Sequence, residues 1–263
     1  MAHRGASQDE AEHTLAAYER ALGDAVDGLE CDVRLTRDGV LVCVHDRKIN
    51  RTSTGRGVVS ALELADLADL DFGSWHRGSV DGQDEAPDWD RTSVLTLDRL
   101  LTVIAERDRP IDLAIETKHP TRYAGLVELA LIELLTKHRL LPCVDDAVVR
   151  PRVMSFATSS LRRVRTLAPT LPAVFLMNRL PMRQRTGILP AGAVAAGPSL
   201  RLLRAHPSYV DRVHRAGGEV HVWTVDRPED IEYVAGLGVD VIITNRPRAV
   251  KEQLSARVDS AAG

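Results

Sequence analysis

The sequence predicts an α/β protein built as a (β/α)8 barrel, or TIM barrel, with a loop insertion after the early strands. Short apolar runs rich in β-branched residues alternate with longer segments of helical period, which is typical of a parallel sheet covered by helices. About eight strand–helix units fit into the 263 residues, as such a barrel requires. No glycine-rich phosphate turn supports an open, doubly wound sheet, which is the other arrangement of alternating strands and helices.

The expected elements follow from this apolar periodicity. The strands are predicted within residues 27–35, 39–46, 111–118, 152–157, 172–177, 192–197, 219–225 and 239–244. The helices are predicted within residues 14–23, 97–106, 122–137, 159–167, 208–216, 228–235 and 247–258, with Thr96, Ser159 and Asp226 as caps. The Asp38–Gly39 step predicts a tight connection between its two flanking strands. A first strand ahead of His3 has only Met1 and Ala2 available, so we expect it to be a stub.

The stretch from Asp46 to Ser93 is long and charged, and its second half is the most irregular part of the chain. We expect it to be the loop insertion. It holds too few apolar residues for a core of its own, so we predict one domain over residues 1–263 rather than two.

Composition excludes several classes of partner. A net charge of -3 and a pI near 6.3 argue against nucleic-acid binding. No apolar run approaches the roughly 18 residues that span a membrane, so we expect no stable membrane insertion. The three cysteines have no metal-like spacing, and the first residues do not resemble a signal peptide. We therefore expect a cytoplasmic protein.

Charged side chains occupy the predicted inward faces of two strands. Side chains alternate between the two faces of a strand. In each strand one face is apolar and suits packing against helices, so the other face must point toward the barrel axis. In the strand predicted within residues 27–35 the inward set is Gly28, Glu30, Asp32 and Arg34. In the strand predicted within residues 111–118 it is Asp112, Ala114, Glu116 and Lys118.

Carboxylates on an inward face repel one another and lose hydration, so they are tolerated only with a cation nearby or at an open rim. Glu30, Asp32 and Glu116 supply three oxygen ligands from neighbouring strands. No thiolate and no paired histidines accompany them, which favours a hard cation, Mg²⁺ or Ca²⁺, over zinc.

Two histidines stand at predicted strand ends, where active sites of such barrels lie. His3 and His45 can share one proton-transfer task as acid and base. The cations Arg4 and Lys118 suit a phosphate group. A hard metal, basic groups and two imidazoles together fit phosphoester cleavage. His221 is a lone histidine, and we interpret it as a core or rim residue.

These residues resemble the motifs of the glycerophosphodiester phosphodiesterases. The similar stretches are AHRGAS, EHTLAAYERAL, DGLECDVRLTRDGVLVCVHD, RTSTGRG, IETKH, VWTVD and GVDVIITNRP, which together cover most of the chain. The resemblance implies a barrel that uses a divalent metal to hydrolyse glycerophosphodiesters, small-molecule substrates, to sn-glycerol 3-phosphate and an alcohol. It implies that Glu30, Asp32 and Glu116 hold the metal, that His3 and His45 are catalytic, and that Arg4 and Lys118 contact phosphate. It also implies that Trp223 is an apolar wall for the glycerol.

The sequence departs from the family pattern at two places. Ala11-Glu12-His13-Thr14 stands where the family usually has Pro-Glu-Asn-Thr, and losing the proline loosens the entry into the first helix. Asn245 stands where the family usually has Asp, which removes one charge near the rim. Neither departure touches the expected metal ligands or the histidine pair.

Three other interpretations remain open from sequence. A lipid phosphodiesterase of the lysophospholipase D or sphingomyelinase D kind calls for an apolar rim or a docking helix, and none is evident. A non-catalytic phosphate-binding barrel has no need of both His3 and His45. Purely structural salt bridges, such as Glu116 with Lys118, are disfavoured because buried ion pairs are poor stabilisers.

Overall fold

The computed structural model describes residues 1–76, 88–141 and 147–262, and for residues 258–262 only the backbone. Parallel strands pair in chain order and curl into a barrel, with β1 next to β2 and β2 next to β4. The strands are β1 (Ala2–His3), β2 (Gly28–Leu35), β4 (Ile111–Thr117), β5 (Val149–Ser155), β6 (Ala173–Met177), β7 (Ala195–Pro198), β8 (Glu219–Val222) and β9 (Val241–Ile242). The first strand is the expected stub. Ala2 bridges to Thr244 beyond β9, and the His3 N–H donates to the Thr244 carbonyl at 2.8 Å, which closes the barrel.

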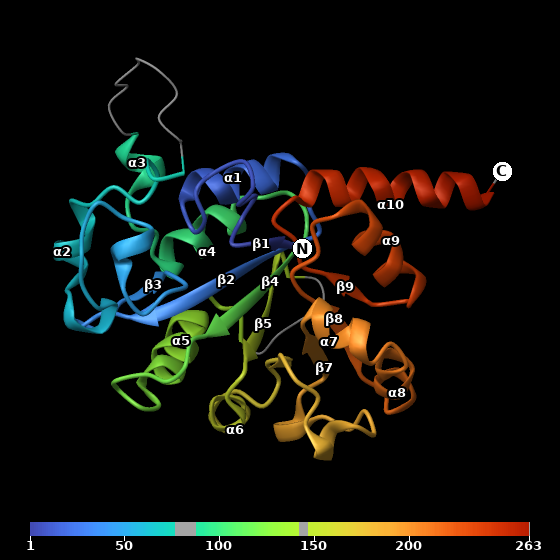
Figure 1. Cartoon of the computed structure of the whole chain (residues 1–263). Helices are drawn as coiled ribbons and strands as arrows, with labels where there is room; N and C mark the ends of the chain where they lie inside the picture. The colour runs from blue at the N-terminus through green and yellow to red at the C-terminus, as the bar shows by residue number, and fades with distance from the viewer. Residues whose placement is uncertain (77–87, 142–146, 263) are drawn as a thin grey trace.

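Helices surround these strands, as Figure 1 shows. They are α1 (Leu15–Gly23), α4 (Leu97–Ala105), α5 (Leu126–Lys137), α6 (Thr158–Leu167), α7 (Leu200–Ala205), α8 (Tyr209–Arg215), α9 (Pro228–Gly236) and α10 (Pro247–Ala262). Helix α4 shows why they form: Leu97, Leu100 and Ile104 recur at helical spacing and are fully buried. The predicted cap Thr96 accepts a hydrogen bond from the Arg99 N–H at 3.1 Å.

Three predictions about helices are wrong. Helix α7 was not expected, because six residues are too few for a clear periodic pattern. Ser159 lies inside α6, whose first residue follows Ala157, so it is not the cap. Asp226 does not cap α9 because its carboxylate instead accepts hydrogen bonds from Thr244 and Asn245.

The predicted tight connection joins β2 to β3 (Leu41–Cys43), which pairs with β2 antiparallel and lies outside the barrel order. Gly39 in this turn has a φ of +86°, a conformation that favours glycine. The hairpin continues from the carboxyl end of β2. Consequently His45, two residues after β3, returns to the mouth of the barrel.

The insertion contains η1 (Ile49–Arg51), η2 (Val59–Ala61), α2 (Leu64–Ala68) and α3 (Trp89–Thr92). The insertion packs against the hairpin rather than alone. Its apolar residues form a small cluster with the outer side of the hairpin: Val42, Val44, Ile49, Val59, Leu67 and Phe72. Val42 of β3 and Val44 directly after it belong to this cluster, so the insertion and the hairpin share it. That residues 1–263 form one domain stays a prediction.

The main core lies between the strands and the helices, with Leu29, Val33 and Ile115 fully buried. Cys31 and Cys43 are buried free thiols, whereas Cys143 lies outside the described residues. Between β6 and β7 the chain forms only the short turns η3 (Met182–Gln184) and η4 (Pro190–Gly192).

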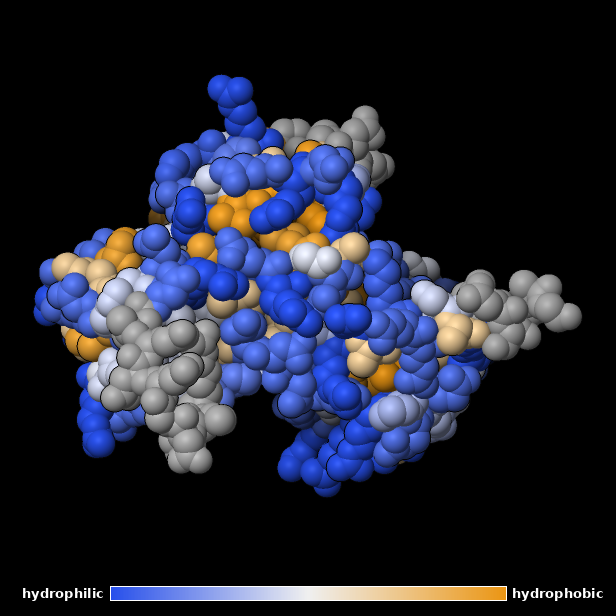
Figure 2. Space-filling model, turned by 90° about the horizontal axis from the view of Figure 1, so that it is seen from above, coloured by the Kyte–Doolittle hydropathy of each residue, from blue (hydrophilic) through white to orange (hydrophobic). Residues whose placement is uncertain are grey.

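Hydrophilic residues dominate the face in Figure 2, where the apolar ones form separate patches. Within the described part of the chain, no helix is long and apolar enough to cross a membrane.

Candidate active site

A pocket of about 290 Å³, here called the reaction pocket, opens at the carboxyl ends of the barrel strands. Seven of the eight site residues predicted from sequence line it, and the eighth, Asp32, lies buried among them. The pocket is lined by His3, Arg4, Glu30, His45, Glu116, Lys118, Met154, Phe156, Leu176, Asn178, Trp223 and Ile243. The structure thus brings together side chains from both ends of the chain.

Three carboxylates form the polar floor of this pocket. Strand register places Asp32 directly beside Glu116, and Glu30 precedes Asp32 by two residues on the same face. One ligand oxygen from each of the three residues lies within 4.8 Å of the others. All three side chains are buried. The spacing and the all-oxygen donor set fit a single hard divalent cation.

Basic side chains surround Asp32. Arg4 Nε lies 3.0 Å from Asp32 Oδ2, and Lys118 Nζ lies 3.2 Å from Oδ1. Lys118 also contacts Glu116 at 2.8 Å. The Glu116–Lys118 salt bridge, named above as an example of a disfavoured structural interpretation, is therefore present, but it belongs to a larger cluster at the mouth of the pocket.

The pKa values show that the carboxylates differ. Burial raises the pKa of Glu30 well above its usual range, and the charge of Asp32 raises it further. Burial and Asp32 likewise raise the pKa of Glu116 to about 8. Burial opposes ionisation of Asp32 too, but the hydrogen bond from His13 and the charge of Lys118 hold its pKa well below the usual range. Ionised Glu30 and Glu116 therefore need more positive charge than the protein supplies, which a divalent metal would provide.

His3 is oriented by Asn245. His3 Nδ1 lies 2.7 Å from Asn245 Oδ1, while the Asn245 amide nitrogen donates to Asp226 at 2.7 Å. Because that amide nitrogen is engaged by Asp226, the Asn245 oxygen faces His3 and accepts its Nδ1–H. The lone pair of His3 is then on Nε2. Burial, reinforced by the charge of Arg4, lowers the pKa of His3 to about 4.

The sequence predicts only that Asn245 removes one charge near the rim. The structure gives this residue a further role. It contacts His3 directly, which the sequence argument missed. Its contact depends on strand pairing, since β9 must lie beside β1 for residues 3 and 245 to meet.

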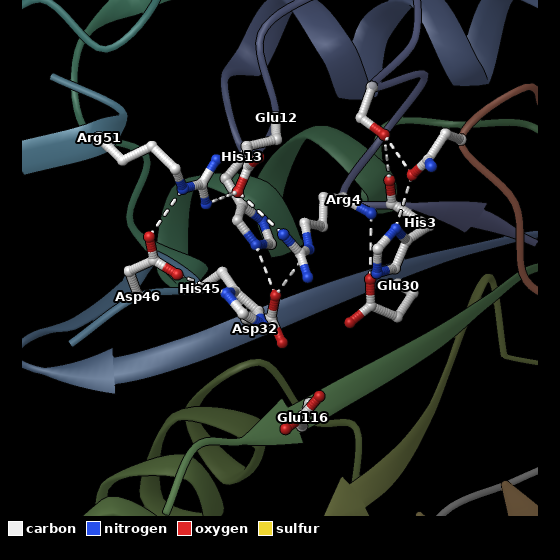
Figure 3. Close-up of polar contacts among 12 residues, drawn as sticks. His3, Arg4, Glu12, His13, Glu30, Asp32, His45, Asp46, Arg51 and Glu116 are labelled. Atoms are coloured by element: carbon white, nitrogen blue, oxygen red, sulfur yellow. Dashed lines mark hydrogen bonds and ion pairs between the residues drawn. The ribbon is translucent and has the colours of Figure 1, made fainter. Parts of the chain in front are cut away.

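His45 is oriented by a chain of ion pairs that Figure 3 shows. His45 Nδ1 lies 2.7 Å from Asp46 Oδ1, and Arg51 binds the other oxygen of Asp46 at 2.7 Å. Arg51 also makes two contacts of 2.8 Å with Glu12, which in turn binds Arg4 at 3.0 Å. In Figure 3 His3 and His45 lie on opposite sides of Arg4 and Asp32.

His13 is a site residue for which sequence reasoning found no partner. It is buried, and its ring bridges the Tyr18 hydroxyl and Asp32 Oδ2, each at 2.9 Å. Its φ of +63° is a conformation in which Asn, Asp and His are enriched. The available signal was that His13 stands where the family usually has Asn. Asn also tolerates this left-handed backbone, so either side chain is expected to leave the loop in the same direction.

The wall opposite the carboxylates is aromatic. Trp223, expected as the apolar wall, lies against Phe156 with ring centroids 5.6 Å apart and the planes nearly perpendicular. The Trp223 indole N–H donates to the Gly197 carbonyl at 2.7 Å, which fixes the ring. Phe156, which sequence reasoning missed, is 41% exposed although it lines the pocket. Its position directly after β5 was the available signal.

His221 does not join the reaction pocket. It is fully buried, and its Nε2 lies 2.9 Å from Glu219 and 3.3 Å from Arg152. The interpretation of His221 as a core residue agrees with this placement.

Known proteins share both the sequence and the fold. The model of the glycerophosphoryl diester phosphodiesterase family matches residues 3–249. A Mycobacterium tuberculosis protein named "Probable glycerophosphodiester phosphodiesterase 1" is 44% identical over 97% of this chain and 91% of its own. A Bacillus subtilis protein named glycerophosphodiester phosphodiesterase is 34% identical, covering 94% of this chain and 83% of its own.

Solved structures agree with the fold. A phosphodiesterase from Oleispira antarctica, solved with the product sn-glycerol-3-phosphate, superposes with a TM-score of 0.81 at 22% identity, covering 97% of this chain and 95% of that chain. A glycerophosphodiester phosphodiesterase from Parabacteroides distasonis gives a TM-score of 0.76 at 23% identity, over 98% and 96% of the two chains. At these identities the solved structures show the fold alone. The sequence matches establish that this chain belongs to the glycerophosphoryl diester phosphodiesterase family.

Proposed function

We propose that this protein hydrolyses glycerophosphodiesters to sn-glycerol 3-phosphate and an alcohol, with a divalent metal and with His3 and His45 as the proton-transfer pair. The observation that carries the proposal is the reaction pocket itself. It holds two imidazoles on opposite sides of a buried carboxylate cluster, with Arg4 and Lys118 alongside. Membership of the family supports the reaction class.

The metal would be Mg²⁺ or Ca²⁺, held by Glu30, Asp32 and Glu116. Their oxygens are close enough to share one ion, and the raised pKa values of Glu30 and Glu116 mark a deficit of positive charge. When bound, such a cation polarises the phosphoryl oxygens and stabilises the charge that develops on them.

Arg4 and Lys118 would hold the phosphate. Both cations lie at the pocket surface while remaining anchored to Asp32. Arginine suits this role because its planar guanidinium can bind two phosphate oxygens at once. Trp223 and Phe156 would cover the carbon atoms of the glycerol and exclude water from that side.

The two histidines would take different parts in the reaction. The Nδ1 partner of His3 is a neutral amide, which stabilises the imidazolium less than a carboxylate does, and its Nε2 is ready to accept a proton. Burial lowers the pKa of His45, but the Asp46 carboxylate at its Nδ1 partly offsets this by stabilising a protonated ring. We assign His3 as the base toward the attacking water and His45 as the acid toward the departing alcohol oxygen.

The test is release of sn-glycerol 3-phosphate from glycerophosphocholine, measured with and without a chelator. We expect release that stops in excess chelator and returns with Mg²⁺ or Ca²⁺. If the folded protein with added metal releases no glycerol 3-phosphate from any of a panel of glycerophosphodiesters, the proposal is wrong. A non-catalytic barrel would still bind the substrate in that case.

A further inference from the structure

A second, smaller pocket, here called the arginine pocket, adjoins the reaction pocket. It lies between the end of β2, the insertion and the segment that leads from β4 to α5. Four cationic side chains line it, namely Arg34, Arg47, Lys118 and Arg122. Lys118 lines both pockets, so the two pockets adjoin at this side chain.

The charge of the arginine pocket is of one sign. No acidic side chain is among the described residues that line it. Arg47 and Arg122 are exposed, and within the described part of the chain neither has a carboxylate at ion-pair distance. Lys118 is paired with Asp32 and Glu116, so Arg47 and Arg122 are the cations at this concave surface that can raise the local concentration of anions.

Arg34 connects the arginine pocket to the catalytic groups. Its Nε and Nη2 donate to the His45 carbonyl at 3.0 and 2.7 Å. This fixes the guanidinium next to the histidine that we assign to the departing alcohol. The alcohol part of a bound diester would therefore leave the reaction pocket on the side where the arginine pocket begins.

The walls of the arginine pocket are tied together. The Tyr123 hydroxyl donates to the Ser60 carbonyl at 2.8 Å, which joins the segment after β4 to the insertion. The Arg122 guanidinium lies over the Tyr123 ring, 5.6 Å from its centroid. Stacking of this kind orients an arginine without neutralising its charge.

We propose that the arginine pocket binds an anionic group, a phosphate or a carboxylate, on the alcohol part of the substrate. This rests on the proposed function and narrows it: the preferred substrates are glycerophosphodiesters whose alcohol carries a negative charge. Choline, a cationic alcohol, gains nothing from Arg34, Arg47 and Arg122.

The experiment compares two substrates that differ by one phosphate group on the alcohol. These are glycerophosphoinositol and glycerophosphoinositol 4-phosphate, and the readout is the ratio of their kcat/KM values for release of glycerol 3-phosphate. We expect the native enzyme to favour the phosphorylated substrate by about tenfold or more, since a hydrogen bond to a charged group contributes at this level. The preference should shrink as salt is added, because the arginines are exposed.

Variants locate the effect. Arg47→Gln and Arg122→Gln should each lower the ratio several-fold, and the double variant should bring it close to one. Arg183→Gln is the matched control, because Arg183 is an exposed arginine in η3 that lines neither pocket. Circular dichroism checks folding of each protein.

The outcomes separate the two proposals. If the native enzyme hydrolyses both substrates with a ratio near one, the arginine pocket has no such role while the proposed function stands. A high ratio that the double variant retains also overturns the inference. If neither these substrates nor glycerophosphocholine is hydrolysed with metal present, the proposed function itself fails.

Discussion

The two sides of the reaction pocket differ in chemistry. Strands β1, β2 and β4 and the segments after them contribute its charged groups, including Arg4, Glu30 and Glu116. The strands from β5 onward contribute Met154, Leu176 and Ile243, with two aromatic rings above them. The comparison teaches that the charged groups of the pocket are confined to one half of the barrel wall, while the other half is mainly apolar and would shield a bound substrate from water if the proposed function holds.

The same division appears in net charge along the chain. Residues 147–210 contain ten arginines and no aspartate or glutamate, although the whole chain has a net charge of -3. Aspartates and glutamates, among them every predicted metal ligand, are thus confined to the rest of the chain. Several of these arginines pair with carboxylates from other parts of the chain, among them Arg150 with Asp112 and Arg163 with Glu128.

The strongest test of the charged side removes the metal. We expect chelation to abolish activity, and Glu30→Gln to lose metal binding while the fold survives. The Arg4 backbone N–H donates to Glu30 Oε2 at 3.0 Å, and a glutamine oxygen can accept that bond. Metal content by elemental analysis and thermal unfolding of the metal-free proteins are the measurements. Because the substitution relieves repulsion with Asp32, metal-free Glu30→Gln should unfold at a temperature no lower than the native protein. Full activity in excess chelator, with no metal detected, would contradict this prediction.

The histidine pair gives the next largest effect. His3→Ala and His45→Ala should each lower kcat by roughly a hundredfold or more, the usual scale for one proton-transfer group. KM should change far less, because Arg4 and Lys118 still hold the phosphate. The measurement is steady-state kinetics on glycerophosphocholine with folding checked by circular dichroism. A folded variant with near-native kcat would remove that histidine from the mechanism.

The Phe156→Ala variant tests the role of the apolar side of the pocket. Phe156 is partly exposed and makes its main ring contact with Trp223, so its loss should leave the fold intact. We expect KM to rise several-fold with kcat little changed, because the ring contacts substrate carbons in the ground state and the transition state alike. Phe156→Leu, which keeps an apolar side chain, should recover most of the difference. A fall in kcat comparable to that of the histidine variants would place Phe156 in the chemistry instead.

The smallest effect concerns stability in acid. Burial opposes ionisation of Glu12, but hydrogen bonds from Arg51 and the charge of Arg4 outweigh it and lower its pKa to about 2. A carboxylate with a lowered pKa in the folded state stabilises the protein above the unfolded pKa of about 4.5, and that contribution disappears as the pH falls toward 2. Its size is on the order of 2 kcal/mol.

Urea unfolding between pH 5 and pH 2.5 measures this contribution. Glu12→Gln should flatten the dependence of the unfolding free energy on pH in that window. Glu133→Gln, which changes an exposed glutamate of α5, is the control and should behave like the native protein. An unchanged slope in Glu12→Gln would show that the chain from Arg4 to Arg51 does not depend on an ionised Glu12.

Much of the site follows from the sequence because strand geometry is simple. Alternation of side chains is enough to place Glu30, Asp32 and Glu116 on one inward face. Parallel strands of similar length then bring their carboxyl ends together, which collects His3 and Lys118 at the same mouth. Local rules thus identify residues that lie on strands or directly beside them.

The remaining groups depend on contacts that no local rule contains. His13 reaches Asp32 from a loop in a left-handed conformation, and Asn245 reaches His3 across the closure of the barrel. The apolar cluster at the insertion likewise depends on tertiary contact, since Val42 of β3 and Val44 directly after it join the insertion, while Leu41 and Cys43 face the main core. Asp226 is of a residue type that commonly caps helices, but its carboxylate instead accepts hydrogen bonds from Thr244 and Asn245, which are distant in sequence.

The hydrogen bond between His3 and Asn245 spans 242 positions of the chain. Synthesis proceeds from the N-terminus, so His3 emerges long before the segment that orients it. Until β9 docks against β1, the imidazole of His3 has neither its fixed tautomer nor its place beside the carboxylates. A growing polypeptide would therefore carry nearly every catalytic group and yet be inert, and activity would begin only when the barrel closes. Onset of turnover during refolding should accordingly coincide with protection of the His3 amide from solvent exchange, which makes the enzyme a reporter of its own completed fold.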